Sequence, residues 1–164
     1  MMILISGTSG SGKSKIAENR LESFEGKKFY AATAKIFDFE TLGRVKKHKA
    51  MRAGKNFITI EREKNLGELN FPEGSNVLIE SLTAWLANEM FDFGNVKNIY
   101  DDIQKLKAEC ENLIIVADDI FSDGIIYDET TEFYRKTLAS LMIKIAREAD
   151  GVIECTGGIA IKLK

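Results

Sequence analysis

Residues 2–14 read MILISGTSGSGKS, an apolar run followed by a loop rich in glycine. The run at residues 2–6 has the length and the branched side chains of a buried β-strand. After it, residues 7–14 match the pattern G-x-x-x-x-G-K-S/T of a phosphate-binding P-loop. A plain glycine-rich turn between a strand and a helix is the alternative interpretation. The full match and its position between a strand and a helix favour the P-loop.

The residue types in this loop suit the binding of a triphosphate. Glycine lets the backbone curl so that N–H groups converge on phosphate oxygens. Lys13 can contact the β- and γ-phosphates, and the hydroxyl of Ser14 can ligate Mg²⁺. The predicted nucleotide contacts of the loop are Gly7, Thr8, Ser9, Gly10, Ser11, Gly12, Lys13 and Ser14. The sequence therefore predicts a nucleoside-triphosphate site with Mg²⁺ as cofactor and Lys13 as a catalytic residue.

Strand-length apolar runs alternate with amphipathic helical patterns along the whole chain. The predicted strands are residues 2–6, 28–33, 56–61, 76–80, 112–117, 151–156 and 159–163. Several of these runs are apolar at nearly every position, which is typical of parallel strands covered on both faces, and Gly157-Gly158 permits a hairpin between the last two. We expect one α/β domain over residues 1–164, a P-loop NTPase domain. Its sheet should be mostly parallel with an antiparallel C-terminal edge strand, and helices should cover both faces.

The composition excludes several classes of protein. The 164 residues carry a net charge of −2, so nothing suggests nucleic acid as a main partner. No apolar run approaches the roughly 20 residues needed to span a bilayer, and no signal-peptide pattern opens the chain. Cys110 and Cys155 give neither a disulfide framework nor a metal-ligand spacing. We expect a buried Cys155 and a reduced, cytoplasmic setting.

A P-loop also needs a carboxylate to hold Mg²⁺, usually at the end of a neighbouring buried strand. Two acidic positions qualify, since Val77-Leu78-Ile79 ends in Glu80 and the run at residues 114–117 ends in Asp118-Asp119. Either acid would emerge at the carboxyl edge of the sheet, where open α/β folds bind ligands. One of them could instead cap the helix that follows. The spacing alone does not choose between Glu80 and Asp118.

Residues 38–52, DFETLGRVKKHKAMR, form a basic segment with the only histidine of the chain. If the segment is helical, as its apolar stripe predicts, Arg44, His48 and Arg52 share one face because they are spaced four apart. Positive neighbours disfavour imidazolium and leave a neutral His48 with a free lone pair. They would also attract the triphosphate that such a nucleophile attacks. A solvated basic helix with an incidental histidine is the alternative.

Taken together, these motifs resemble those of a known family, the bifunctional adenosylcobinamide kinase / adenosylcobinamide-phosphate guanylyltransferase family of cobalamin assembly. The similarity extends over essentially the whole chain. It rests on the P-loop, on Tyr30-Ala31-Ala32-Thr33-Ala34, on the histidine segment, on Phe57…Thr59…Glu61, on Glu80-Ser81-Leu82-Thr83-Ala84-Trp85-Leu86-Ala87-Asn88, and on Thr156-Gly157-Gly158-Ile159…Ile161-Lys162-Leu163-Lys164. This combination is far more specific than the P-loop alone.

The resemblance implies a mechanism and a set of site residues. In the family, the histidine that matches His48 carries the guanylyl group covalently, so His48 is implied as a catalytic residue. The resemblance favours Glu80 over Asp118 for Mg²⁺, beside Ser14. The further nucleotide contacts it implies are Ala32, Thr33, Ala34, Arg44, Lys49, Arg52, Glu61 and Glu80. It also implies GTP and/or ATP and a corrinoid as substrates, a recombinase-like sheet and a homotrimer.

The chain departs from the family pattern after the fifth predicted strand. It has Asp118-Asp119-Ile120-Phe121 and Gly124-Ile125-Ile126-Tyr127 where the family has Asn-Glu-Val-Gly and Gly-Ile-Val-Pro. In the following helix, Arg135-Lys136 and Met142 stand where the family has Arg-Asp and a later Asn. We expect this region to shape the acceptor site and the subunit contacts. Two alternatives stay open: a kinase with a single activity, and a nucleotide-binding sensor or assembly protein without catalysis.

Overall fold

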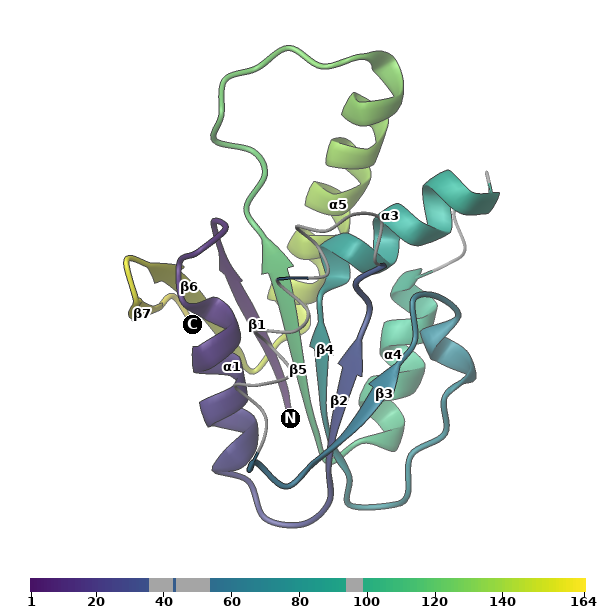
Figure 1. Cartoon of the computed structure of the whole chain (residues 1–164), viewed down its shortest axis with the longest axis vertical. Helices are drawn as coiled ribbons and strands as arrows, with labels where there is room; N and C mark the ends of the chain where they lie inside the picture. Colours follow the sequence, from purple (N-terminus) through teal and green to yellow (C-terminus); the bar gives the residue numbers. More distant parts are fainter. Residues whose placement is uncertain (36–42, 44–53, 94–98) are drawn as a thin grey trace.

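The computed structural model describes residues 1–35, 43, 54–93 and 99–164. Within these ranges the chain forms the strands and helices shown in Figure 1. The strands are β1 (Met2–Gly7), β2 (Lys28–Ala32), β3 (Phe57–Glu61), β4 (Asn76–Glu80), β5 (Asn112–Asp118), β6 (Gly151–Thr156) and β7 (Ile159–Lys162). The helices are α1 (Lys13–Glu22), the short 3₁₀ helix η1 (Leu66–Glu68), α3 (Leu82–Phe93), α4 (Ile99–Glu109) and α5 (Glu129–Glu148).

The described strands form one sheet in the order β3-β2-β4-β5-β1-β6-β7. Neighbouring strands from β3 to β6 are parallel, and β7 pairs with β6 in the antiparallel direction. Both the mostly parallel sheet and its antiparallel C-terminal edge were expected from the sequence and are confirmed. The strand boundaries differ from the predicted ones by at most one residue.

The apolar runs of the central strands are buried on both faces, as their composition predicts. In β1, Met2 and Leu4 belong to the core on one face, while Ile3 and Ile5 belong to the core on the other. β5 alternates in the same way, with Ile115 on the first face and Ile114 on the second. Because both faces must be covered, these strands require helices on each side of the sheet.

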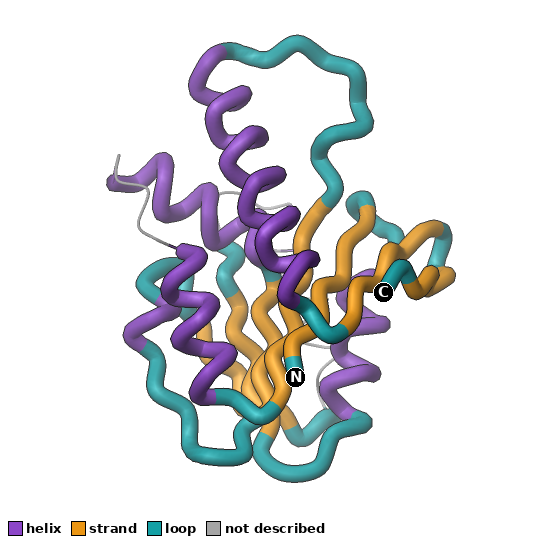
Figure 2. The backbone as a smooth tube through the Cα atoms, turned by 180° about the vertical axis from the view of Figure 1, so that it is seen from behind, coloured by secondary structure: helices purple, strands orange, loops and turns teal. Residues whose placement is uncertain are grey.

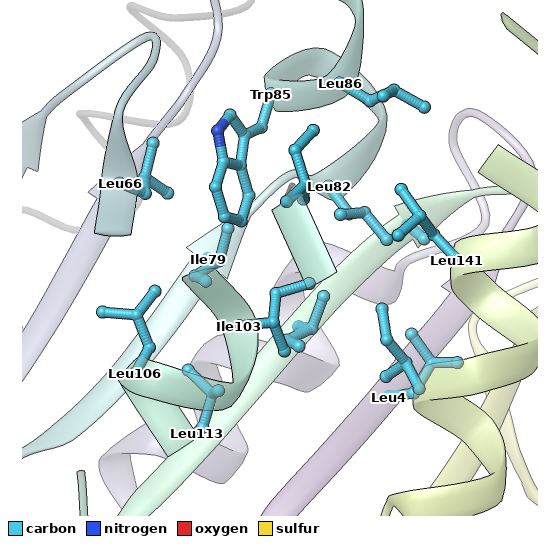
Figure 3. Close-up of a cluster of buried hydrophobic side chains, with 14 of the residues drawn as sticks. Leu4, Leu66, Ile79, Leu82, Trp85, Leu86, Ile103, Leu106, Leu113 and Leu141 are labelled. Atoms are coloured by element: carbon cyan, nitrogen blue, oxygen red, sulfur yellow. The ribbon is translucent and has the colours of Figure 1, made fainter. Parts of the chain in front are cut away.

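Helices cover both faces. α1 contributes Ala17 and Leu21 to the smaller core, and Figure 2 shows α3, α4 and α5 together on the opposite face. There Trp85, Leu106 and Leu141 pack with the strands (Figure 3). Helices on both faces are thus confirmed. None of the described helices is long and apolar enough to cross a membrane.

Local sequence signals explain where the C-terminal elements begin. Asp128 is the N-cap of α5, and its side chain accepts hydrogen bonds from the amides of Thr130 and Thr131. The expected hairpin forms between β6 and β7, and Cys155 is buried as predicted. The predicted basic helix at residues 38–52 lies outside the described residues, apart from Gly43.

Candidate active site

The predicted site residues outside the basic segment gather at the carboxyl edge of the sheet. β1 and β5 pair so that Gly7 lies opposite Asp118. In the same way, Ala32 at the end of β2 lies opposite both Glu61 of β3 and Glu80 of β4. All these strands point upward in Figure 1, so their ends lie along the upper edge of the sheet. Residues that are far apart in the sequence thus meet where open α/β folds bind ligands.

The loop between β1 and α1 has the backbone shape of an anion-binding site. Gly10 and Gly12 adopt φ angles of 76° and 92°, which side-chain-bearing residues rarely adopt. Gly12 is the N-cap residue of α1, and because glycine has no side chain it does not cap the first amides of the helix. Those amides and the positive end of the helix are therefore available to a phosphate.

The C-terminal hairpin supports this loop from one side. The amide of Gly158 donates a hydrogen bond to the carbonyl of Ser11 at 2.9 Å. A Cβ atom on Gly12 would lie 3.2 Å from the Cα of Gly158, and one on Gly7 would lie 2.5 Å from the carbonyl oxygen of Cys155. The P-loop glycines are thus needed for close packing against β6 and its turn as well as for their conformation.

Lys13 is enclosed and has an anionic partner. Its side-chain amine lies 2.6 Å from Oδ1 of Asp118 and donates to the carbonyl of Thr8 at 3.0 Å. Lys13 is only 6% exposed. These contacts hold the ammonium group beside the loop. In P-loop proteins in general, this lysine contacts the β- and γ-phosphates.

Ser14 and Glu80 form the second polar contact of the site. The Ser14 hydroxyl donates to Oε1 of Glu80 at 2.6 Å, while Oε2 of Glu80 is enclosed and has no hydrogen-bond partner among the described residues. Burial raises the pKa of Glu80 to about 7, against the lowering effects of the Ser14 hydrogen bond and the nearby Lys13. A carboxyl group this poorly solvated is suited to a cationic ligand.

The donor set fits Mg²⁺. This ion prefers oxygen ligands and is often held by one or two protein groups together with phosphate oxygens and water. The Ser14 hydroxyl and the unused oxygen of Glu80 supply such groups at one point. In the described part of the chain, no three His, Cys, Asp or Glu side chains gather as a ligand set.

The structure separates the two acids between which the spacing did not choose. Glu80 contacts Ser14, whereas Asp118 contacts Lys13. The idea that one of them caps a helix is wrong, because Asp128 caps α5, and the Ser81 hydroxyl accepts from the amide of Ala84 at the start of α3. The two carboxylates thus have different partners within one site.

The segments that follow β2 and β3 complete the edge. Thr33 is fully buried, whereas Ala34 and Glu61 are exposed. The Thr33 hydroxyl donates to the carbonyl of Ser81 at 2.8 Å and accepts from its amide at 2.7 Å. The remaining predicted residues, Arg44, His48, Lys49 and Arg52, lie outside the described residues, so their roles stay predictions.

Two residues of the site belong to the motifs that carry the family resemblance, although the sequence predicts no role for them. The Thr83 hydroxyl accepts a hydrogen bond from the amide of Asp118 at 2.7 Å, and so fixes the end of β5. Asn88 donates to two carbonyl groups behind β2 and β3. Both residues lie on α3, at positions that a motif reveals but whose contacts depend on how α3 packs over the sheet.

A third polar feature was not signalled by any motif. Glu18 on α1 is almost fully buried and pairs with Lys55 at 3.0 Å. Lys55 follows the basic segment closely and precedes β3, so this ion pair joins the P-loop helix to the chain entering β3. Glu18 lies four residues after Ser14, on the same side of α1.

Comparison with known proteins identifies the family of the chain. A model of the family described as cobinamide kinase / cobinamide phosphate guanyltransferase matches residues 3–163. The chain belongs to this family. The resemblance drawn from the sequence motifs and the P-loop α/β fold expected with it are therefore confirmed.

Two members of the cobinamide kinase / guanyltransferase family show how far the similarity extends. The bifunctional adenosylcobalamin biosynthesis protein CobU of Escherichia coli (strain K12) is 28% identical over 183 aligned residues, which cover 100% of both chains. The protein of the same name from Salmonella typhimurium is 27% identical, again over 100% of both chains. The chain is thus similar to these proteins from end to end.

Proposed function

We propose that this chain carries out both reactions of its family at the carboxyl edge of the sheet. It would phosphorylate the terminal hydroxyl of cobinamide, in the adenosylcobinamide form, and then transfer GMP from GTP onto cobinamide phosphate. The observation that carries the proposal is the meeting of Lys13, Ser14 and Glu80 at this edge, in a chain that matches the family over residues 3–163.

In the kinase step, the hydroxyl oxygen of cobinamide attacks the γ-phosphorus of a nucleoside triphosphate. A new P–O bond forms, the bond from the γ-phosphorus to the β–γ bridging oxygen breaks, and a nucleoside diphosphate leaves with the hydroxyl proton released. The chain contributes mainly charge stabilisation and positioning. Lys13 exchanges Asp118 for phosphate oxygens, while the open amides at the start of α1 receive the rest of the negative charge.

In the guanylyl step, His48 attacks the α-phosphorus of GTP, a P–N bond forms, and pyrophosphate leaves. An oxygen of cobinamide phosphate then attacks the same phosphorus, so that a P–O bond forms, the P–N bond breaks and His48 is regenerated. The proposal assigns His48 on its residue type, its basic neighbours and the family resemblance. Arg44, Lys49 and Arg52 would bind the triphosphate from the same segment.

Ser14 and Glu80 would hold Mg²⁺, which supplies Lewis-acid neutralisation of phosphate charge when bound. Glu61 and the segment of Ala32, Thr33 and Ala34 would contact the nucleotide. A homotrimer and a cytoplasmic location are further proposals that rest on the sequence and the family resemblance.

Product analysis tests the proposal. The chain is incubated with cobinamide, Mg²⁺ and either ATP or GTP, and separately with cobinamide phosphate and GTP. We expect cobinamide phosphate from the first mixture and GDP-cobinamide plus pyrophosphate from the second. A single product would favour a kinase or a transferase with one activity. Nucleotide binding without either product would contradict the proposal and favour a sensor or assembly protein.

A further inference from the structure

Asn88 of α3 joins the two segments that leave β2 and β3. Its side-chain amide donates one hydrogen bond to the carbonyl of Thr33 at 2.8 Å and a second to the carbonyl of Glu63 at 2.9 Å. Asn88 is only 6% exposed. A carboxamide has two N–H donors, and both serve backbone groups from different strands.

These two carbonyls lie just past the end of the backbone pairing. The amide of Thr33 still donates to Glu80, and the amide of Arg62 to Ala32, at 2.9 and 3.0 Å. Beyond this point the chain leaves the sheet as separate loops, and the buried carbonyl of Thr33 without a donor would cost about 1–3 kcal/mol. Asn88 supplies the donors that the sheet no longer provides, and it sets the spacing between the segments that follow β2 and β3.

The segments that follow β2 and β3 lie next to residues that the proposed function needs. Ala34 follows Thr33 and is exposed at the edge, and Glu61 ends β3 two residues before Glu63. The Thr33 hydroxyl is bonded to both backbone groups of Ser81, the residue after Glu80. Asn88 therefore connects the ends of β2 and β3 directly, and the end of β4 through Thr33.

We infer that Asn88 is a positioning residue of the nucleotide site. It holds the segments after β2 and β3 at the spacing that lets Ala34, Glu61 and Glu80 contact one bound nucleotide. Asn88 itself does not touch the nucleotide, because both of its donors are directed at backbone carbonyls. The inference rests on the proposed function for the identity of the ligand.

Asn76 provides a matched control for a purely structural role. It is fully buried at the start of β4, and its amide likewise donates to two backbone carbonyls, those of Glu25 and Lys27, at 2.6 and 3.3 Å. It lies at the amino edge of the sheet, opposite the site. The side-chain N–H groups of the two residues thus donate to the same kind of acceptor at opposite ends of the same sheet.

The test compares Asn88→Asp with Asn76→Asp, because aspartate keeps the shape but replaces the donor group with an oxygen that faces two carbonyl oxygens. Both variants should be less stable in urea unfolding. The dissociation constant of GTP is then measured by equilibrium binding, under conditions where all proteins are folded. We expect the dissociation constant to rise about tenfold or more in Asn88→Asp, which corresponds to the loss of about one hydrogen bond to the nucleotide. In Asn76→Asp it should stay within about twofold of the wild-type value.

Hydrogen exchange supplies a second measurement that does not depend on GTP. Faster exchange in residues 33–35 and 61–65 of folded Asn88→Asp, or of the milder Asn88→Ala if the first variant does not fold, would support the inference. Unchanged GTP affinity in a folded Asn88 variant would overturn it, as would an equal loss in Asn76→Asp. If wild type itself binds no GTP, the proposed function fails and the inference with it.

Discussion

At the scale of single residues, the site pairs each of its two central polar groups with a different acid. Lys13 is held by Asp118 and Ser14 by Glu80. In the proposed function, a bound nucleotide replaces the first contact and Mg²⁺ uses the second, since a hydroxyl and a carboxylate are both oxygen ligands. The two acids should therefore respond differently to neutralisation, although they lie in the same site.

Neutral, isosteric variants separate these two roles. Glu80→Gln should weaken the binding of nucleoside triphosphate in the presence of Mg²⁺ by about tenfold or more, because a metal ligand is lost. Asp118→Asn should instead bind several-fold more tightly at low salt, because Lys13 no longer has a competing partner. Equilibrium titrations with and without Mg²⁺ measure both effects. If Asp118→Asn lost the dependence on Mg²⁺ while Glu80→Gln kept it, the assignment would be reversed.

The raised pKa of Glu80 predicts how the stability of the nucleotide-free, Mg²⁺-free protein depends on pH. The ordinary pKa of this carboxyl group, which applies to the unfolded chain, is 4.5, and in the folded protein the pKa is about 7. The folded protein therefore holds the proton more tightly than the unfolded chain. Stability should therefore fall as the pH rises from about 5 to about 7.5, by about 3 kcal/mol at most. Urea unfolding at pH 5.5 and 8 measures the change. Glu80→Gln should remove most of it, and an undiminished pH dependence in this variant would show that another group causes the effect.

At the scale of secondary-structure elements, most of the sheet is predictable from local patterns. The apolar runs of β4 and β5 can be recognised because strands buried on both faces are apolar at most positions. The end of β2 shows the limit of such patterns. Thr33 continues the strand-like sequence, but its side-chain hydroxyl bonds both backbone groups of Ser81. The regular strand pairing therefore ends at Ala32. The predicted strand at residues 28–33 is one residue too long for this reason.

The candidate site likewise has residues that local sequence predicts and residues that depend on the packing of distant elements. Lys13 and Ser14 follow from one contiguous motif, because the P-loop is local in sequence. The choice between Glu80 and Asp118 depends on how β4, β5 and α1 are placed, which no spacing encodes. The contacts of Asn88 require both the register of β2 and β3 and the packing of α3. Long-range contacts of this kind are what the sequence alone leaves undetermined.

The contact between the P-loop and the C-terminal hairpin gives a prediction for these two elements. Gly12 and Gly10 both have positive φ angles, but only at Gly12 would a Cβ approach another backbone atom, the Cα of Gly158 at 3.2 Å. Gly10→Ala should cost about 1 kcal/mol from backbone strain, and Gly12→Ala about 2–3 kcal/mol because the hairpin must also shift. Urea unfolding of both variants tests this, and equal losses would show that the hairpin does not constrain the loop.

At the scale of the whole molecule, the region that departs from the family pattern projects from the rest. The loop after β5 and the first turns of α5 rise above the carboxyl edge of the sheet in Figure 1. Ile125, Ile126 and Phe133 are exposed there, Ile126 at 96%. Exposed apolar side chains gathered in one region are typical of a surface that binds a partner or a substrate.

We predict that part of this surface is covered in a homotrimer. Sedimentation equilibrium at micromolar concentration should give a mass three times that of one chain, independent of added nucleotide. Ile126→Asp tests whether the projecting loop is involved, since a charge in an apolar contact should shift the distribution toward smaller species. A monomeric mass for wild type over the whole concentration range would contradict the prediction.

The central claim is that a covalent guanylyl group forms on His48, beside a nucleotide held by Lys13 and the P-loop. GTP labelled at the α-phosphate is incubated with the folded chain and Mg²⁺, and the protein is then denatured in alkali, where a phosphoramidate survives. Wild type should retain the label and lose it to cobinamide phosphate, His48→Ala should retain none, and label at the γ-phosphate should never remain. Equal labelling of wild type and His48→Ala, or no labelling of either, would contradict the claim.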